Sequence, residues 1–244
     1  MGQAGVIAWR SINFSIESNN PGVPSEHVAR ARARKRTNKQ SGMLTMEITQ
    51  KRTVHIVALL LIIAAVTQAI YTAYYAAEME PPRQLLWGTE GVLFVLMTAF
   101  AGSAMVQAKN LHLGWSAIAF AAALNVVQVG VGLTMFGPFF EAAGEIKAME
   151  PVAKSVLAFS FMVYNAAKML LALAAIVFGM AKLNAGAKAL GGLTALVGAV
   201  AFFSNALSMA LGRDFLGELP LAGGSGVLAT VLLAVCLFGL NSDD

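Results

Sequence analysis

The hydrophobic residues of this chain gather into six long apolar runs, separated by short and mostly polar connections. Each run has roughly the twenty residues that an α-helix needs to cross the ~30 Å hydrocarbon core of a bilayer. The pattern predicts an all-α integral membrane protein, a bundle of about six transmembrane helices. The predicted spans are 54–77, 85–107, 113–136, 155–180, 189–211 and 220–240.

Residues 1–53 contain no apolar run long enough for a span or for a secretory signal. They include a cluster of basic residues between Arg30 and Lys39. We expect a disordered cytoplasmic tail here, followed by a transmembrane domain over 54–244. The basic cluster favours contact with anionic membrane lipid over a role as a nucleic-acid arm, so no nucleic-acid partner is predicted. An internal start at Met43 or Met46 is a further hypothesis for this segment.

The composition agrees with a membrane protein. The chain is 57% hydrophobic and 12% charged, and the charged fraction is about half that of an ordinary soluble domain. Its single cysteine, Cys236, lies in the last apolar run, so no intramolecular disulfide can form. With three histidines and one cysteine, we expect neither a metal site nor another cofactor.

The distribution of charge predicts the orientation of the spans. Residues 1–53 carry nine Lys/Arg against three Asp/Glu, whereas residues 54–244 carry eight against ten. Lys109, Lys182 and Lys188 lie in connections on the same side of the membrane as the basic tail. Because basic residues mark the cytoplasmic side, we predict a multi-pass protein of the cell membrane with both termini in the cytoplasm.

Lys168 is the most unusual residue, because it lies near the middle of the fourth apolar run. Burying an ammonium group in a bilayer costs from ~2.5 to more than ~10 kcal/mol, and such charges are therefore candidates for functional sites. Tyr164 and Asn165 lie on the same stretch of helix. Glu90 is the only acid inside a span, but the predicted depths of Glu90 and Lys168 differ by about eight residues, or roughly 12 Å of helix rise. Direct pairing of the two charges is therefore not expected.

Three other spans carry polar residues three residues apart, which places each pair on one helix face. Such faces should turn away from lipid and toward one another. The span directions place most of these residues in the outer half of the membrane, so we predict a polar pocket that is open, or can open, to the extracytoplasmic side. Its predicted ligand-binding residues are Gln68, Tyr71, Glu90, Asn125, Gln128, Tyr164, Asn165, Lys168, Asn205 and Ser208.

Structural roles for the same residues stay open at this point. Polar side chains such as Gln68, Asn125, Gln128 and Asn205 also serve as hydrogen bonds between helices, worth about 0.6 kcal/mol each. Tyr71 and Trp87 fit an aromatic belt at the membrane interface. Glu90 could be an interfacial residue that reaches toward water. Lys168 could be a structural charge that backbone carbonyls and Asn165 satisfy.

The chain has no phosphate-binding loop, no nucleophile elbow and no His/Asp cluster suited to hydrolysis, so no catalytic residues are predicted. The favoured hypothesis is a protein that binds or transports a small polar or anionic solute or an ion, with Lys168 as the positive anchor. The alternative is a non-catalytic accessory or structural subunit, whose polar residues hold its helices together and whose surface docks a membrane-protein partner or a second copy. A third hypothesis, an enzyme with Lys168 and Tyr164 as acid or base, has no specific motif behind it.

Overall fold

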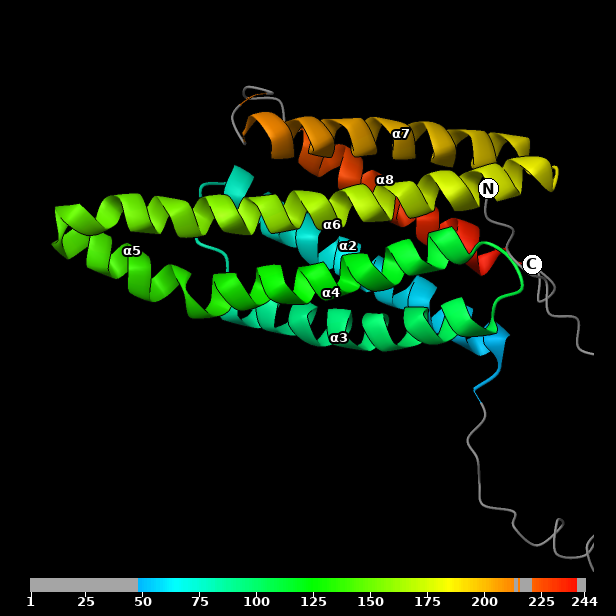
Figure 1. The fold of residues 1–244 in the computed structure, drawn as a ribbon, viewed down its shortest axis with the longest axis horizontal. Helices are drawn as coiled ribbons and strands as arrows, with labels where there is room; N and C mark the ends of the chain where they lie inside the picture. The colour runs from blue at the N-terminus through cyan, green and yellow to red at the C-terminus, as the bar shows by residue number, and fades with distance from the viewer. Residues whose placement is uncertain (1–47, 213–214, 216–220, 241–244) are drawn as a thin grey trace, which may run out of the picture. The chain divides into compact units, whose positions relative to one another are not determined.

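In a computed structural model, residues 48–212, 215 and 221–240 are described, and these residues are almost entirely helical (Figure 1). The predicted tail over 1–53 lies outside the described residues up to position 47. The loop charges Arg213, Asp214 and Glu218 and the C-terminal pair Asp243 and Asp244 also lie outside them.

Within the described residues, six helices are long and apolar enough to cross a membrane, as the sequence predicts. They are α2 (Gln50–Ala76), α3 (Arg83–Gln107), α4 (His112–Thr134), α6 (Glu150–Asn184), α7 (Lys188–Leu211) and α8 (Leu221–Phe238). Large apolar side chains project outward from them, for example Val92, Leu196 and Phe203, whose exposed fractions are 63%, 64% and 66%. A soluble protein would bury such surface, so these side chains mark the faces that contact lipid.

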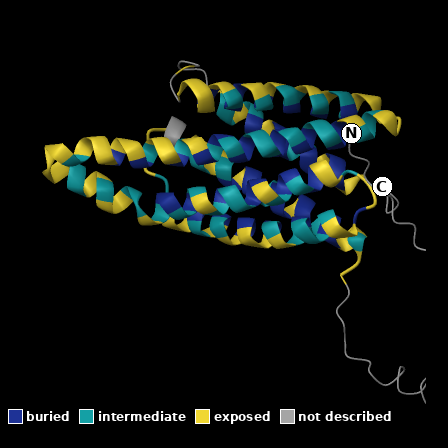
Figure 2. Cartoon of the chain, in the orientation of Figure 1, coloured by how far each residue is buried: buried dark blue, intermediate teal, exposed yellow. Residues whose placement is uncertain are grey.

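The connection after α4 differs from the expected polar loop. Phe136–Glu145 forms a further helix, α5, and a 3₁₀ turn over Lys147–Met149 leads into α6. Helix α6 therefore begins at Glu150, five residues earlier than the predicted span. In Figure 1, α5 and the first turns of α6 extend past the ends of α3 and α7, and Figure 2 shows that no part of α5 is buried.

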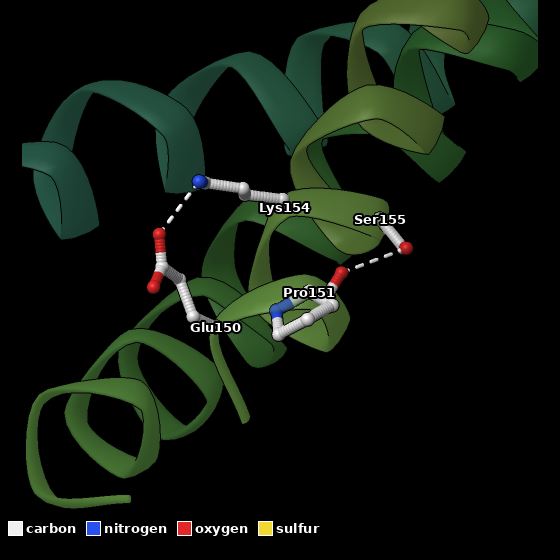
Figure 3. A network of polar contacts seen from close by, with 4 residues as sticks. All are labelled: Glu150, Pro151, Lys154 and Ser155. Atoms are coloured by element: carbon white, nitrogen blue, oxygen red, sulfur yellow. Dashed lines mark hydrogen bonds and ion pairs between the residues drawn. The ribbon is translucent and has the colours of Figure 1, made fainter. Parts of the chain in front are cut away.

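Local contacts define the start of α6 (Figure 3). Pro151 lies in the first turn, where its missing N–H leaves no hydrogen bond unmade. Lys154 Nζ lies 2.6 Å from Glu150 Oε1, and Ser155 Oγ donates to the Pro151 carbonyl at 2.8 Å. The ion pair is exposed, and such pairs contribute only about 0–1 kcal/mol. These contacts are confined to the start of α6, and the residues that pack α6 against the other long helices lie further along it.

Helix α6 lies at the centre of the packing, because it contacts α4, α7 and α8, while α2 packs on α3 and α8. The apolar core between the helices is filled by large buried side chains from five of them. These include Leu61, Phe94, Met97, Ile118, Phe178, Leu233 and Leu237. Helices α2, α3, α4, α6 and α8 contact one another in a closed ring, and α7 packs on α6 and α8.

Glycines let α6 and α7 approach at backbone distance. A Cβ atom at Gly179 would lie 2.7 Å from the Ala195 nitrogen, and one at Gly198 would lie 3.0 Å from the Ala172 carbonyl oxygen. A Cβ atom at Gly191 would overlap the backbone of Leu183. In a membrane, where lipid is as apolar as the helices, this close packing is a main source of helix association.

We predict that Gly191→Ala destabilises the bundle and that Gly192→Ala does not. At Gly192 the nearest atom to an added Cβ is Leu183 Cδ1 at 4.0 Å, so alanine fits there and gains about 1 kcal/mol in helix propensity. At Gly191 the overlap with backbone should lower the free energy of unfolding by about 1–3 kcal/mol. The single cysteine, Cys236, is 0% exposed, so the temperature at which a maleimide labels it in detergent measures unfolding. Equal labelling temperatures for the two variants would contradict this account of the α6–α7 contact.

Candidate functional site

Four of the predicted site residues lie at one level of the bundle. The α3–α4 and α6–α7 turns meet at one end, around a cavity of about 150 Å³ whose lining includes Asn110 and Lys182. The start of α2 is at the same end, where the His55 ring lies 5.8 Å from that of Phe238 in α8. Four polar residues lie about 16 to 18 residues along their helices from this end, which is roughly 25 Å of helix rise. They are Gln68, Glu90, Lys168 and Asn205.

A buried hydrogen bond joins α2 to α3 at this level. Thr67 Oγ1 donates to Glu90 Oε1 at 2.7 Å, and the Glu90 side chain is only 5% exposed. A carboxyl group at this depth needs such a donor, because an unpaired buried polar group costs several kcal/mol in lipid. Glu90 is therefore an internal residue of the bundle and does not reach toward the interface.

A second buried hydrogen bond joins α2 to α6. Lys168 Nζ donates to Gln68 Oε1 at 2.5 Å, and it lies 5.3 Å from the centre of the Tyr164 ring, within the range of a cation–π interaction. Lys168 is 1% exposed. Because Thr67 and Gln68 are neighbours, α2 links Glu90 on one side to Lys168 on the other.

Glu90 and Lys168 lie at the same level of the bundle, but no ion pair within 4 Å joins them in the described part of the chain. The absence of direct pairing agrees with the sequence-based expectation, whereas the expected difference in depth was wrong. The sequence-based prediction took the depth of Lys168 in the membrane from its position near the middle of the fourth apolar run. Since α6 continues beyond the other helices toward Glu150, the middle of that run is not the middle of the bundle.

Asn205 on α7 is 0% exposed and holds an unpaired acceptor. Its Nδ2 donates to the Ala201 carbonyl at 2.8 Å and to the Ala222 carbonyl of α8 at 3.2 Å. Both partner atoms are carbonyl oxygens, which can only accept a hydrogen bond, so the side-chain nitrogen of Asn205 and not its oxygen must face them. Its Oδ1 is buried and has no partner among the described residues. Such an atom costs about 1–3 kcal/mol and calls for an explanation.

Gly226 on α8 brings Lys168 and Asn205 together. A Cβ atom at this position would lie 3.3 Å from Lys168 Cδ and 3.8 Å from Asn205 Nδ2. The two side chains thus lie against the same point of α8, which a larger residue would occupy. We refer to Thr67, Gln68, Glu90, Tyr164, Lys168 and Asn205 together as the polar layer.

An aromatic cluster lies about one helical turn from the polar layer, on the side of α5. Tyr71 and Trp87 stack with ring centres 5.4 Å apart, and Trp87 meets Phe136 edge to face at 5.8 Å. Trp87 is buried, and a Cβ atom at Gly132 would overlap its ring. Trp87 therefore belongs to the interior of the bundle and not to an interfacial belt. We refer to Tyr71, Trp87 and Phe136 as the aromatic cluster.

The remaining predicted site residues are not part of these hydrogen bonds. Asn125 is buried, but its Nδ2 donates to the Ala121 carbonyl of its own helix at 2.9 Å. Asn165 and Ser208 are buried and Gln128 is half-buried. The structure thus links Gln68, Glu90, Tyr164 and Lys168 by direct or shared contacts, with Asn205 beside them, and it leaves Asn125 and Gln128 outside the polar layer.

Two members of the site, Thr67 and Gly226, are absent from the sequence-based prediction. Thr67 lies next to Gln68, which is a weak signal, and its partner Glu90 is 23 residues away. Gly226 lies in a stretch with Gly223 and Gly224, and only the packing of α8 on α6 and α7 shows which glycine matters. Among the described residues, no group of three His, Cys, Asp or Glu side chains is arranged to hold a metal ion.

Comparisons with known protein families, with curated proteins and with solved structures found no match to this chain. Its class follows from the fold and the site. The described part of the chain has six helices suited to span a membrane, and they enclose a lysine and a glutamate that are almost inaccessible. The structure defines a multi-pass helical membrane protein with a buried charged layer.

We predict that Thr67→Val lowers the free energy of unfolding by about 1–3 kcal/mol, because the Glu90 carboxyl group loses its buried donor. Thr72→Val is the matched control, since Thr72 is exposed and bonds only the Gln68 carbonyl of its own helix. The control should change the free energy by less than about 0.5 kcal/mol. Thermal labelling of Cys236 measures both variants. Equal stability of Thr67→Val and wild type would show that the Thr67–Glu90 bond does not hold α2 to α3.

Proposed function

We propose that the polar layer binds a small polar or anionic solute and that the bundle moves this solute across the membrane, with Lys168 as the positive anchor. The proposal rests on the burial of Lys168 and on the hydrogen bond that its ammonium group makes. Its ammonium is 1% exposed and donates one hydrogen bond, to the neutral Gln68. An ammonium has three donors, and a buried charge is stable only with close partners. A bound anion would supply a close counter-charge and further acceptors.

The composition of the layer supports transport over simple packing. In many transporters the solute site lies between helices that can move relative to each other. Here the layer is formed by α2, α3, α6 and α7, and the stacked rings of Tyr71 and Trp87 lie about one helical turn away from it. We expect a solute to enter from this side, which requires the rings of Trp87 and Tyr71 to separate.

Charge at the two ends supports the proposed orientation. At the end of the α3–α4 and α6–α7 turns, the described charged residues are all basic: Lys51, Arg52, Lys109, Lys182 and Lys188. At the other end, Arg83, Lys147 and Lys154 are outnumbered by acids: Glu78, Glu80, Glu141, Glu145 and Glu150. By the positive-inside rule the first end faces the cytoplasm. The aromatic cluster then faces outward, and both termini are cytoplasmic.

Lys168→Met tests the anchor. Methionine keeps most of the volume and removes the charge, so the protein should fold while uptake of small anions by proteoliposomes falls at least about tenfold. Chloride, acetate, lactate and phosphate are the probes. Lys154→Met is the control, because that side chain is 71% exposed and bonds only Glu150. If wild type moves none of these anions and instead purifies as a stoichiometric complex with another membrane protein, the accessory-subunit alternative replaces transport.

Single cysteines test whether the layer opens. In a Cys236→Ser background, Asn165→Cys and Asn205→Cys should react with an impermeant maleimide added from outside, and Trp87→Ala should increase the rate. Ala174→Cys is the control, since Ala174 is 0% exposed and lies on the cytoplasmic side of Lys168. If neither test position reacts in folded protein, with or without Trp87, the layer is closed to the outside and its polar groups serve helix packing.

A further inference from the structure

We infer that the solute is a small carboxylate with a hydrogen-bond donor on the neighbouring carbon, as in 2-hydroxy and 2-amino acids. The inference rests on the proposed function, because it assigns the carboxylate to Lys168. It adds a second point of recognition: the donor of the solute pairs with Asn205 Oδ1. The geometry thus assigns two ends to the site, one that attracts an anion and one that accepts a hydrogen bond.

The accepting end follows from the orientation of the Asn205 amide. Turning the amide over would place Oδ1 against the two carbonyl oxygens that Nδ2 now contacts, at 2.8 and 3.2 Å. The orientation in the structure therefore leaves a buried acceptor free, and only a donor can satisfy it. A chloride ion or a simple carboxylate has no donor, and its lone pairs would repel Oδ1.

The side chains that carry the two ends lie against the same point of α8. Lys168 Cδ and Asn205 Nδ2 both lie within 4 Å of the point where Gly226 lacks a side chain. Beyond Cδ, the lysine chain has two more single bonds, which let the ammonium move while its stem stays against α8. A site with an ammonium beside an amide oxygen matches a carboxylate whose neighbouring carbon bears a hydroxyl or ammonium group.

The polar layer also contains the charge of Glu90, which affects a 2-amino acid and a 2-hydroxy acid differently. Glu90 belongs to the same layer as Lys168 and is bonded to Thr67. A 2-amino acid brings one positive and one negative group to a layer that already has one of each, whereas a 2-hydroxy acid adds a net negative charge. Both share the carboxylate and the donor, and the experiment separates them.

The test compares three solutes with the same carbon skeleton: propanoate, lactate and alanine. Binding to the full chain in lipid nanodiscs is measured by calorimetry for wild type, Asn205→Leu and Lys168→Met, with Asn184→Leu as a control at the exposed end of α6. Wild type should bind lactate or alanine at least about tenfold more tightly than propanoate, since a site built to accept a hydrogen bond rejects the analogue that lacks the donor. Asn205→Leu should abolish this preference.

The outcomes separate the inference from the proposed function. If wild type binds all three solutes equally and Lys168→Met abolishes binding of all three, the anion site stands and the role of Asn205 is wrong. If wild type binds none of them, the carboxylate assignment and the inference that depends on it both fail. Protection of Cys236 from maleimide verifies folding of each variant. The preference of wild type for lactate or alanine over propanoate tests the inference even if Asn205→Leu does not fold.

Discussion

The contact between Lys168 and Gln68 is the interaction on which the interior of the bundle depends. Helix α2 packs on α3 and α8, and α6 packs on α4, α7 and α8, so the lysine side chain reaches across the middle to join α2 to α6. A charge at this depth is stable only while it has partners. Any movement that separates α2 from α6 must therefore supply Lys168 with another acceptor.

Small residues make this arrangement sterically feasible. Gly226 leaves room for the lysine stem against α8, and Gly132 leaves room for the Trp87 ring of the aromatic cluster. Gly191 lets α6 and α7 approach at backbone distance. Without a hydrophobic driving force between helices in lipid, close contact and buried hydrogen bonds have to hold the bundle together. The same features therefore provide stability and a polar interior.

The six spans were predictable because crossing a bilayer imposes a length and a composition that can be read along the chain. The helix α5 was missed, since Phe136, Phe139 and Phe140 were read as the end of a span and the start of a polar loop. Much of the candidate site was also predictable: Lys168 and Glu90 stand out as charges in apolar runs. Thr67 and Gly226 do not, because a threonine and a glycine are ordinary residues in membrane helices.

The sequence by itself determined that this protein is a bundle of membrane helices and that Lys168 and Glu90 need partners inside it, because apolar length and the cost of burying a charge are properties of single helices. The tertiary structure alone decided who those partners are. Gln68 rather than Glu90 meets Lys168, Thr67 meets Glu90, and Asn205 keeps one acceptor free. These outcomes depend on the rotation and relative height of each helix, which follow from where glycines allow close approach and from how far α6 extends past its neighbours.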